Sequence, residues 1–218
     1  MKTFCLLVTL LLSLVYLPNN YYEFSAEDFF ELSEVNQPID VLHPDYRLLD
    51  AALFHQTNLE RQKQGLSLLV FHGGLYKASV QHTEAMVRLK FFAHDNPYDT
   101  EHQTMVNRIE RYASEMRAMG ENIEERFILD PEKAYCVERK QTNEYRYYDC
   151  DTHKSIPMLT YKQFAKACLN VWMHSSGHRH NILSRNFRYL SCAGRVMPHP
   201  FSTASGPSAR LTQDFGGN

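Results

Sequence analysis

The chain has 218 residues, a formal net charge of −2 and a composition that is ordinary for a globular protein. A chain of this length can bury a sizeable core as one domain, so folding requires neither a metal nor a disulfide. No Lys/Arg-dense stretch is present, which argues against a nucleic-acid-binding protein. Composition therefore leaves enzymes and binding proteins open.

The first 20 residues are typical of an export signal. Lys2 supplies a positive charge, residues 4–17 are almost wholly apolar, and a Pro-Asn-Asn triplet ends the run. A transmembrane helix needs about 20 apolar residues, more than this run offers. We expect a signal peptide at 1–20, no transmembrane span beyond it, and an exported protein that is extracellular, periplasmic or in the cell envelope. Because no small-x-small pair follows the run, an uncleaved anchor is the alternative.

The segment 21–44 is acidic and aromatic with little periodicity. We expect it to be a linker or a strap along the domain surface. The folded domain is then expected over 45–218, with a hairpin flanked by cysteines inserted at about 131–157.

Helical periodicity recurs five times in the expected domain. The second of these helices carries His82 inside its apolar stripe, where a histidine is more often a hydrogen-bonded core residue than a ligand, so we leave it out of the candidate site. The third helix is expected to run to Met116 and to be broken by Gly120. The expected helices begin at Asp45, after Gly74, at Met105, at Tyr161 and at Gly177.

Two late segments, 189–197 and 209–215, are strand-like and are expected to form an antiparallel pair. Helices that come first and strands that come late favour a small antiparallel sheet packed by helices. The expected class is therefore α+β.

Four cysteines follow the signal, and an even number in an exported chain favours disulfides. Segments 135–139 and 144–148 are predicted strands joined by a polar turn. A hairpin of this kind, centred near Asn143, places Cys136 opposite Cys150 and predicts a disulfide between them.

Cys168 and Cys192 remain after that pairing. They either form a second disulfide by default or are buried free thiols.

Two histidines and a glutamate are the candidate functional residues. They are His94 in a Phe-Ala-His segment, Glu121 in a Gly-Glu-Asn-Ile segment, and His178 in a Gly-His-Arg segment. Two imidazoles and a carboxylate that converge on a cleft could hold a divalent metal or exchange protons. The alternative is a hydrogen-bonded polar cluster in a fold that mainly presents a surface.

These segments, in this order, resemble the CAP superfamily, which includes cysteine-rich secretory proteins, antigen 5 and pathogenesis-related proteins, and in particular its bacterial branch. The resemblance covers roughly residues 55–215. The segments that carry it are His55-Gln56-Thr57-Asn58 with Arg61 and Gly65, Phe92-Ala93-His94, Gly120-Glu121-Asn122-Ile123, Trp172 with Gly177-His178-Arg179 and Asn181-Ile182-Leu183, and Thr212-Gln213-Asp214-Phe215.

The resemblance implies an α-β-α sandwich with a small antiparallel sheet between helical layers. It also implies a cleft lined by His94, Glu121 and His178. Many relatives carry a second glutamate three residues after the tryptophan, and here that position is Ser175. The chain therefore lacks a full set of two histidines and two glutamates, and one anionic ligand is lost.

The sequence favours an exported binding or interaction module whose partner is an envelope component, a lipid or another protein. At best its cleft holds Zn²⁺ or another divalent metal weakly, through His94 and His178. The alternative is a metal-assisted hydrolase or peptidase in which Glu121 and His178 are catalytic. Ser175 in place of a carboxylate, together with the absence of a separate nucleophile motif, favours the binding module.

Overall fold

The computed structural model describes residues 20–130 and 134–218. The expected signal peptide, apart from Asn20, lies outside the described residues, and so does the start of the expected insertion.

A four-stranded sheet forms the centre of the fold, with strand order β1-β5-β6-β2. Strand β6 is antiparallel to both β5 and β2, whereas the short β1 is parallel to β5, so the sheet is mixed rather than wholly antiparallel. The strands are β1 (Val70–Phe71), β2 (Ala118–Phe127), β5 (Tyr189–Val196) and β6 (Ser208–Gly217).

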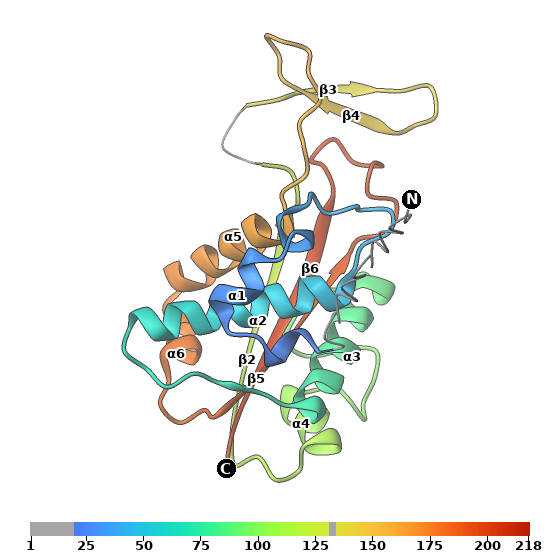
Figure 1. Cartoon of the computed structure of the whole chain (residues 1–218). Helices are drawn as coiled ribbons and strands as arrows, with labels where there is room; N and C mark the ends of the chain where they lie inside the picture. The colour runs from blue at the N-terminus through green and yellow to red at the C-terminus, as the bar shows by residue number, and fades with distance from the viewer. Residues whose placement is uncertain (1–19, 131–133) are drawn as a thin grey trace, which may run out of the picture.

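Helices cover both faces of this sheet, so the expected α+β sandwich is confirmed (Figure 1). Helices α3 and α4 pack on one face, and α2, α5 and α6 pack on the other. All of them except α6 begin at a residue whose side chain caps the helix; the α2 N-cap, Asp45, accepts a hydrogen bond from the Leu48 amide. The helices are α2 (Tyr46–Lys63), α3 (Gly73–Leu89), α4 (Met105–Tyr112), α5 (Tyr161–His174) and α6 (Ser176–Leu183).

The expected third helix is too long, since α4 ends at Tyr112 and Gly120 lies inside β2. The glycine is needed there for packing rather than as a helix stop. A Cβ at this position would lie 2.8 Å from Cζ of Phe187, whose ring covers the strand. The absence of a side chain lets that ring approach the sheet.

The segment before α2 is folded onto the domain. It contains the 3₁₀ turns η1 (Tyr21–Glu23) and η2 (Glu34–Asn36) and the helix α1 (Ala26–Glu31). Phe29 and Val35 are fully buried in the main core. The strap therefore contributes core side chains, which a free linker would not.

A second, two-stranded sheet stands apart from the body of the molecule (Figure 1). It consists of β3 (Cys136–Arg139) and β4 (Tyr145–Tyr148). The Tyr145 amide donates to the Phe201 carbonyl at 2.7 Å, which attaches the hairpin to the β5–β6 connection. The β5–β6 connection lies beside the Phe127 end of β2, whereas Glu121 lies near the opposite end. The hairpin therefore decorates one end of the sandwich, away from Glu121.

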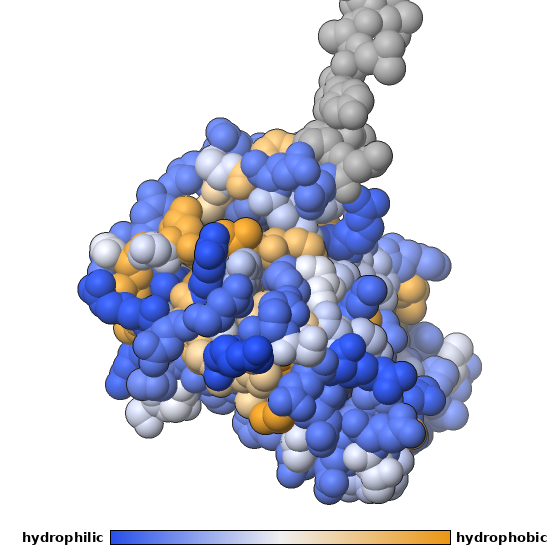
Figure 2. Space-filling model, turned by 90° about the horizontal axis from the view of Figure 1, so that it is seen from below, coloured by the Kyte–Doolittle hydropathy of each residue, from blue (hydrophilic) through white to orange (hydrophobic). Residues whose placement is uncertain are grey.

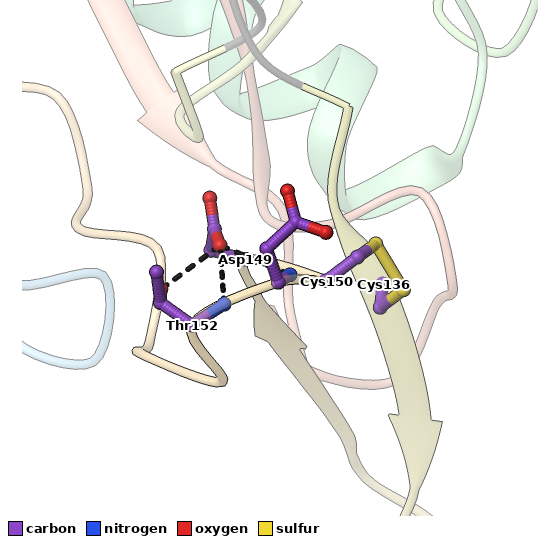
Figure 3. The surroundings of a disulfide bond; sticks show 5 residues. Cys136, Asp149, Cys150 and Thr152 are labelled. Atoms are coloured by element: carbon purple, nitrogen blue, oxygen red, sulfur yellow. Dashed lines mark hydrogen bonds between the residues drawn. A yellow bond between two sulfur atoms is a disulfide. The ribbon is translucent and has the colours of Figure 1, made fainter.

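The predicted disulfide between Cys136 and Cys150 is confirmed, with the two Cα atoms 5.1 Å apart (Figure 3). The predicted register is wrong, however, because Cys136 pairs with Tyr148. Cys150 follows β4 in a turn that is held by Asp149, whose carboxylate accepts from the Thr152 amide at 2.8 Å.

Cys168 and Cys192 do not form a second disulfide; both are buried free thiols. Cys168 lies on α5, which packs against β2, whereas Cys192 lies on β5 on the other side of β6. Strands two places apart in a sheet are separated by about 10 Å, beyond the Cα spacing that a disulfide spans.

The surface seen from below is mostly hydrophilic, with hydrophobic residues in small separate patches (Figure 2). Within the described residues, no helix combines the length and the apolar character needed to cross a membrane.

Candidate functional site

His94 and Glu121 meet where the loop from α3 to α4 crosses the start of β2. The Nδ1 atom of His94 lies 2.8 Å from Oε1 of Glu121. A carboxylate oxygen can only accept, so Nδ1 carries the hydrogen and Nε2 is left for another partner. The His94 side chain is about half exposed, and that of Glu121 is almost completely buried. Through its hydrogen bond, Glu121 raises the pKa of His94.

The second oxygen of Glu121 is occupied by Arg108, a residue that sequence reasoning missed. Nη2 of Arg108 donates to Oε2 of Glu121 at 2.6 Å, and both side chains are buried. Nη2 also donates to the His94 carbonyl at 3.0 Å, so one guanidinium holds the loop and the strand together. A usable signal existed, because Arg108 lies three residues after Met105 and four before Tyr112, on the apolar face of α4.

Asp214 faces Glu121 across the β2–β6 pair and is fully buried. Burial, and then the negative charge of Glu121, raise the pKa of Asp214 well above its ordinary value. Burial also acts to raise the pKa of Glu121, but the His94 hydrogen bond and the Arg108 charge outweigh it and hold that pKa low. These opposite shifts favour the negative charge on Glu121 over one on Asp214. Asp214 accepts a hydrogen bond from Ser79 at 2.8 Å.

His178 is positioned by two asparagines that connect α6 to β2. Asn122 donates to the His178 carbonyl at 3.2 Å, and Asn181 donates to Oδ1 of Asn122 at 2.9 Å. Burial and, secondarily, the charge of His94 lower the pKa of His178, which keeps its imidazole neutral. Asn122 thus braces the backbone of α6 against β2.

Ser175 joins α5 to α6 as the N-cap residue of α6, but its hydroxyl makes no capping hydrogen bond. The serine therefore occupies the N-cap position without the side-chain hydrogen bond that a capping serine usually makes. Trp172 is fully buried in the core, and Arg179 donates to the Met173 carbonyl at 2.9 Å, a structural role for each.

The chemical capacity of the site follows from these contacts. Among residues 20–130 and 134–218, no group of three or more His, Cys, Asp or Glu side chains is placed to hold a metal ion. His82, which lies close enough for Glu121 and Arg108 to influence its pKa, uses Nε2 to donate to the Ala93 carbonyl at 3.0 Å, as expected for a core histidine. What remains for a ligand is the open nitrogen of His94 and the imidazole of His178.

A mixed sheet between two helical layers, with a histidine–glutamate pair at the start of β2, defines the protein as a CAP-type domain. Residues 54–196 match the cysteine-rich secretory protein family, CAP, and the chain belongs to this family. No curated protein matches the sequence.

Three solved structures are similar to this chain. An extracellular protein containing an SCP domain from Bacillus anthracis is 20% identical over 79% of this chain, with a TM-score of 0.49. An outer surface protein from Borrelia burgdorferi is 14% identical over 76%, with a TM-score of 0.47. A cysteine-rich secretory protein from Staphylococcus aureus is 11% identical over 80%, with a TM-score of 0.46. The chain spans 42%, 90% and 40% of these three proteins, respectively.

Proposed function

We propose that this chain is an exported binding module of the CAP family, in which His94 and His178 hold a divalent metal weakly. Its partner is an envelope component, a lipid or another protein. One observation supports this proposal above the others: both carboxylate oxygens of Glu121 are engaged, Oε1 by His94 and Oε2 by Arg108.

This engagement argues against the hydrolase alternative. A general base must have an oxygen within hydrogen-bond reach of the proton it removes. The carboxylate of Glu121 is buried and its charge is already balanced by Arg108. Its role is therefore to orient His94 and to connect β2 to α4.

The same contact suits His94 to metal binding. Histidines that bind metals commonly donate their other ring hydrogen to a carboxylate, which orients the ring and makes the ligating nitrogen more basic. Glu121 stands in that relation to His94. Two imidazoles are fewer than the three or four protein ligands of most zinc sites, so the affinity is expected to be weak. A bound divalent ion would supply positive charge to attract an anionic group of a partner.

Calorimetric titration of zinc into the purified protein tests this proposal. We expect weak binding that is abolished by His94→Ala and by His178→Ala. His180→Ala changes an exposed histidine on the same helix and is the matched control. Binding should weaken at mildly acidic pH, because the raised pKa of His94 lets protons compete for its imidazole.

Equal binding by wild type and all three variants would refute the assignment of the site. Undetectable binding by wild type would favour the interpretation in which His94, Glu121 and His178 only brace the fold.

A further inference from the structure

Strand β2 is one edge of the four-stranded sheet, because β6 pairs with it along one side. The Ile128 amide, which directly follows the strand, donates to the Pro207 carbonyl at 2.7 Å. Backbone groups alternate in direction along an antiparallel strand, so the even-numbered residues of β2 direct theirs toward β6 and the odd-numbered residues direct theirs outward. The outward carbonyl of Glu121 accepts from Asn181 of α6 at 3.2 Å, which agrees with this assignment.

The outward edge of β2 is unpaired beyond Glu121. In the part of the chain that the structure describes, the outward amide and carbonyl groups of Ile123, Glu125 and Phe127 take part in no hydrogen bond. Glu125 and Phe127 are also exposed, Phe127 by 49%. A row of unpaired backbone groups on an exposed edge strand is a template for pairing with another strand. The side chains of this segment decide which strand fits it.

Space beside this edge is present on the α5 side of the sheet. A groove of about 600 Å³ lies between β2 and α5, with Arg126 on the strand side and Ala167 and Val171 on the helix side. Val171 is 42% exposed. Phe127, whose side chain is on the opposite face of β2 from that of Arg126, adds a second exposed apolar side chain. Apolar surface therefore flanks the open edge on both faces of the sheet.

The open segment is complementary to itself in the antiparallel direction. It reads Ile-Glu-Glu-Arg-Phe over residues 123–127. When two copies pair about Glu125, Ile123 faces Phe127 of the second copy, and Glu124 faces Arg126 of the second copy. Apolar pairs and pairs of opposite charge that lie directly opposite each other both stabilise antiparallel strands. The arrangement has two-fold symmetry, so each of these pairs occurs twice.

This register also satisfies the backbone. Ile123, Glu125 and Phe127 carry the outward backbone groups, and in this register they face one another across the two-fold axis. Each facing pair can therefore exchange both of its N–H···O bonds. A shift of the register by one residue would place an outward residue opposite an inward one and would lose these bonds.

Glu125 faces its own copy at the axis, and this is the one like-charged pair in the register. The charge of each Glu125 is offset within its own chain, because Nε of Arg210 lies 2.9 Å from Oε2 of Glu125. Ile123 belongs to a small apolar cluster with Ala85, Met86 and Phe91. Phe127 of the second copy would lie at the rim of that cluster and lose part of its exposure to water.

We propose that the open edge of β2 pairs antiparallel with the same edge of a second copy of this chain, about Glu125, so that one continuous sheet runs through a two-fold dimer. The α5 helices of the two copies then lie on the same face of that sheet, with the grooves that contain Val171 turned toward each other. The dimer does not rest on the metal site, because neither His94 nor His178 takes part in the pairing.

Sedimentation equilibrium of the purified chain over a concentration series tests the proposal. The buffer is metal-free and contains no reductant, so that the result is separated from the fate of the zinc site and the disulfide stays closed. Burial raises the pKa of Glu124 to about 8, and an opposing guanidinium favours its ionised form, so the experiment is done at about pH 8.5. We expect a reversible dimer with a dissociation constant on the order of 0.1 mM or below, as suits a small interface.

Two substitutions of Glu125 separate pairing from the loss of its carboxylate. Glu125→Pro removes an outward N–H, which an edge strand tolerates, and should raise the dissociation constant at least about tenfold. Glu125→Gln also loses the charge that faces Arg210, but it keeps the N–H and removes the like-charged pair at the axis. Its dimer should be as tight as that of wild type or tighter. Near-UV circular dichroism of the buried Trp172 verifies that both variants are folded.

A charge reversal tests the register independently. Arg126→Glu places two carboxylates opposite each other on both sides of the axis and should also raise the dissociation constant about tenfold or more. The matched control is Arg139→Glu on β3, which should leave the constant unchanged. A monomer at every concentration up to about 1 mM would overturn the proposal and leave the edge to a strand of a different chain. A dimer that Glu125→Pro and Arg126→Glu leave intact would overturn it as well, because its interface would lie elsewhere.

Discussion

Replacement of Arg108 by methionine tests whether the buried ion pair stabilises the domain. The guanidinium donates to Oε2 of Glu121 at 2.6 Å and to the carbonyls of His94 and Gln103 at 3.0 and 2.8 Å. Both charged side chains are almost fully buried. Removal of one partner of a buried pair typically costs about 3–5 kcal/mol, because the other charge remains without compensation. For a chain of this size that is a fall in melting temperature of about 10 °C or more.

Arg111→Met is the matched control on the same helix. Arg111 forms an ion pair with Glu101 at 3.6 Å, and both of these side chains are largely exposed. Exposed pairs contribute about 0–1 kcal/mol, so the control should stay close to wild type. Urea unfolding is followed by the fluorescence of Trp172, the single tryptophan, which is buried.

The stability lost in Arg108→Met should also depend on pH. Arg108 helps to hold the pKa of Glu121 below its ordinary value. The stability that this lowered pKa contributes is present above the unfolded pKa and is lost as the pH falls through the folded pKa. The difference between wild type and Arg108→Met should therefore shrink in acid. A loss equal to that of Arg111→Met, or one that acid leaves unchanged, would show that this reasoning is wrong.

Two further substitutions test local features. Burial raises the pKa of Glu124 to about 8 despite the nearby Arg126, so its contribution to stability is lost as the pH rises through that value. Glu124→Gln should raise the free energy of unfolding, measured by urea unfolding, by on the order of a few kcal/mol at mildly alkaline pH and should change it little in acid. Gly74→Ala would press a Cβ against the Tyr112 carbonyl oxygen and should lower the free energy of unfolding, measured by thermal unfolding, by about 1–3 kcal/mol. The matched control Gly73→Ala places its Cβ in open space and should change this free energy by less than about 0.5 kcal/mol. Equal effects at both positions would contradict the packing of α3 on α4.

Local patterns in the sequence predicted much of the fold. Helices α2, α5 and α6 lie close to their expected positions, because an amphipathic helix carries its signal in neighbouring residues. The antiparallel β5–β6 pair was predicted correctly because its two strands are also marked by patterns of neighbouring residues. Strand β2 was missed because helices cover both faces of the sheet at this point. Its buried run from Gly120 to Glu124 therefore shows no alternation of polar and apolar residues.

The sequence likewise determined one part of the candidate site, and the tertiary structure decided the rest. The sequence by itself determined that the chain carries His94, Glu121 and His178 in family order, with Ser175 where a second glutamate would stand. It also determined that Cys136 and Cys150 are close enough in the chain for a hairpin to join them.

Only the tertiary structure decided what Glu121 can do. Arg108, 13 residues away on another element, takes one carboxylate oxygen, and Asp214 reaches the same place from the last strand. The pKa of a buried carboxylate depends on its distance to other charges and on its exclusion from water. Both quantities arise only when β2, β6 and α4 pack together, so no local pattern of residues contains them.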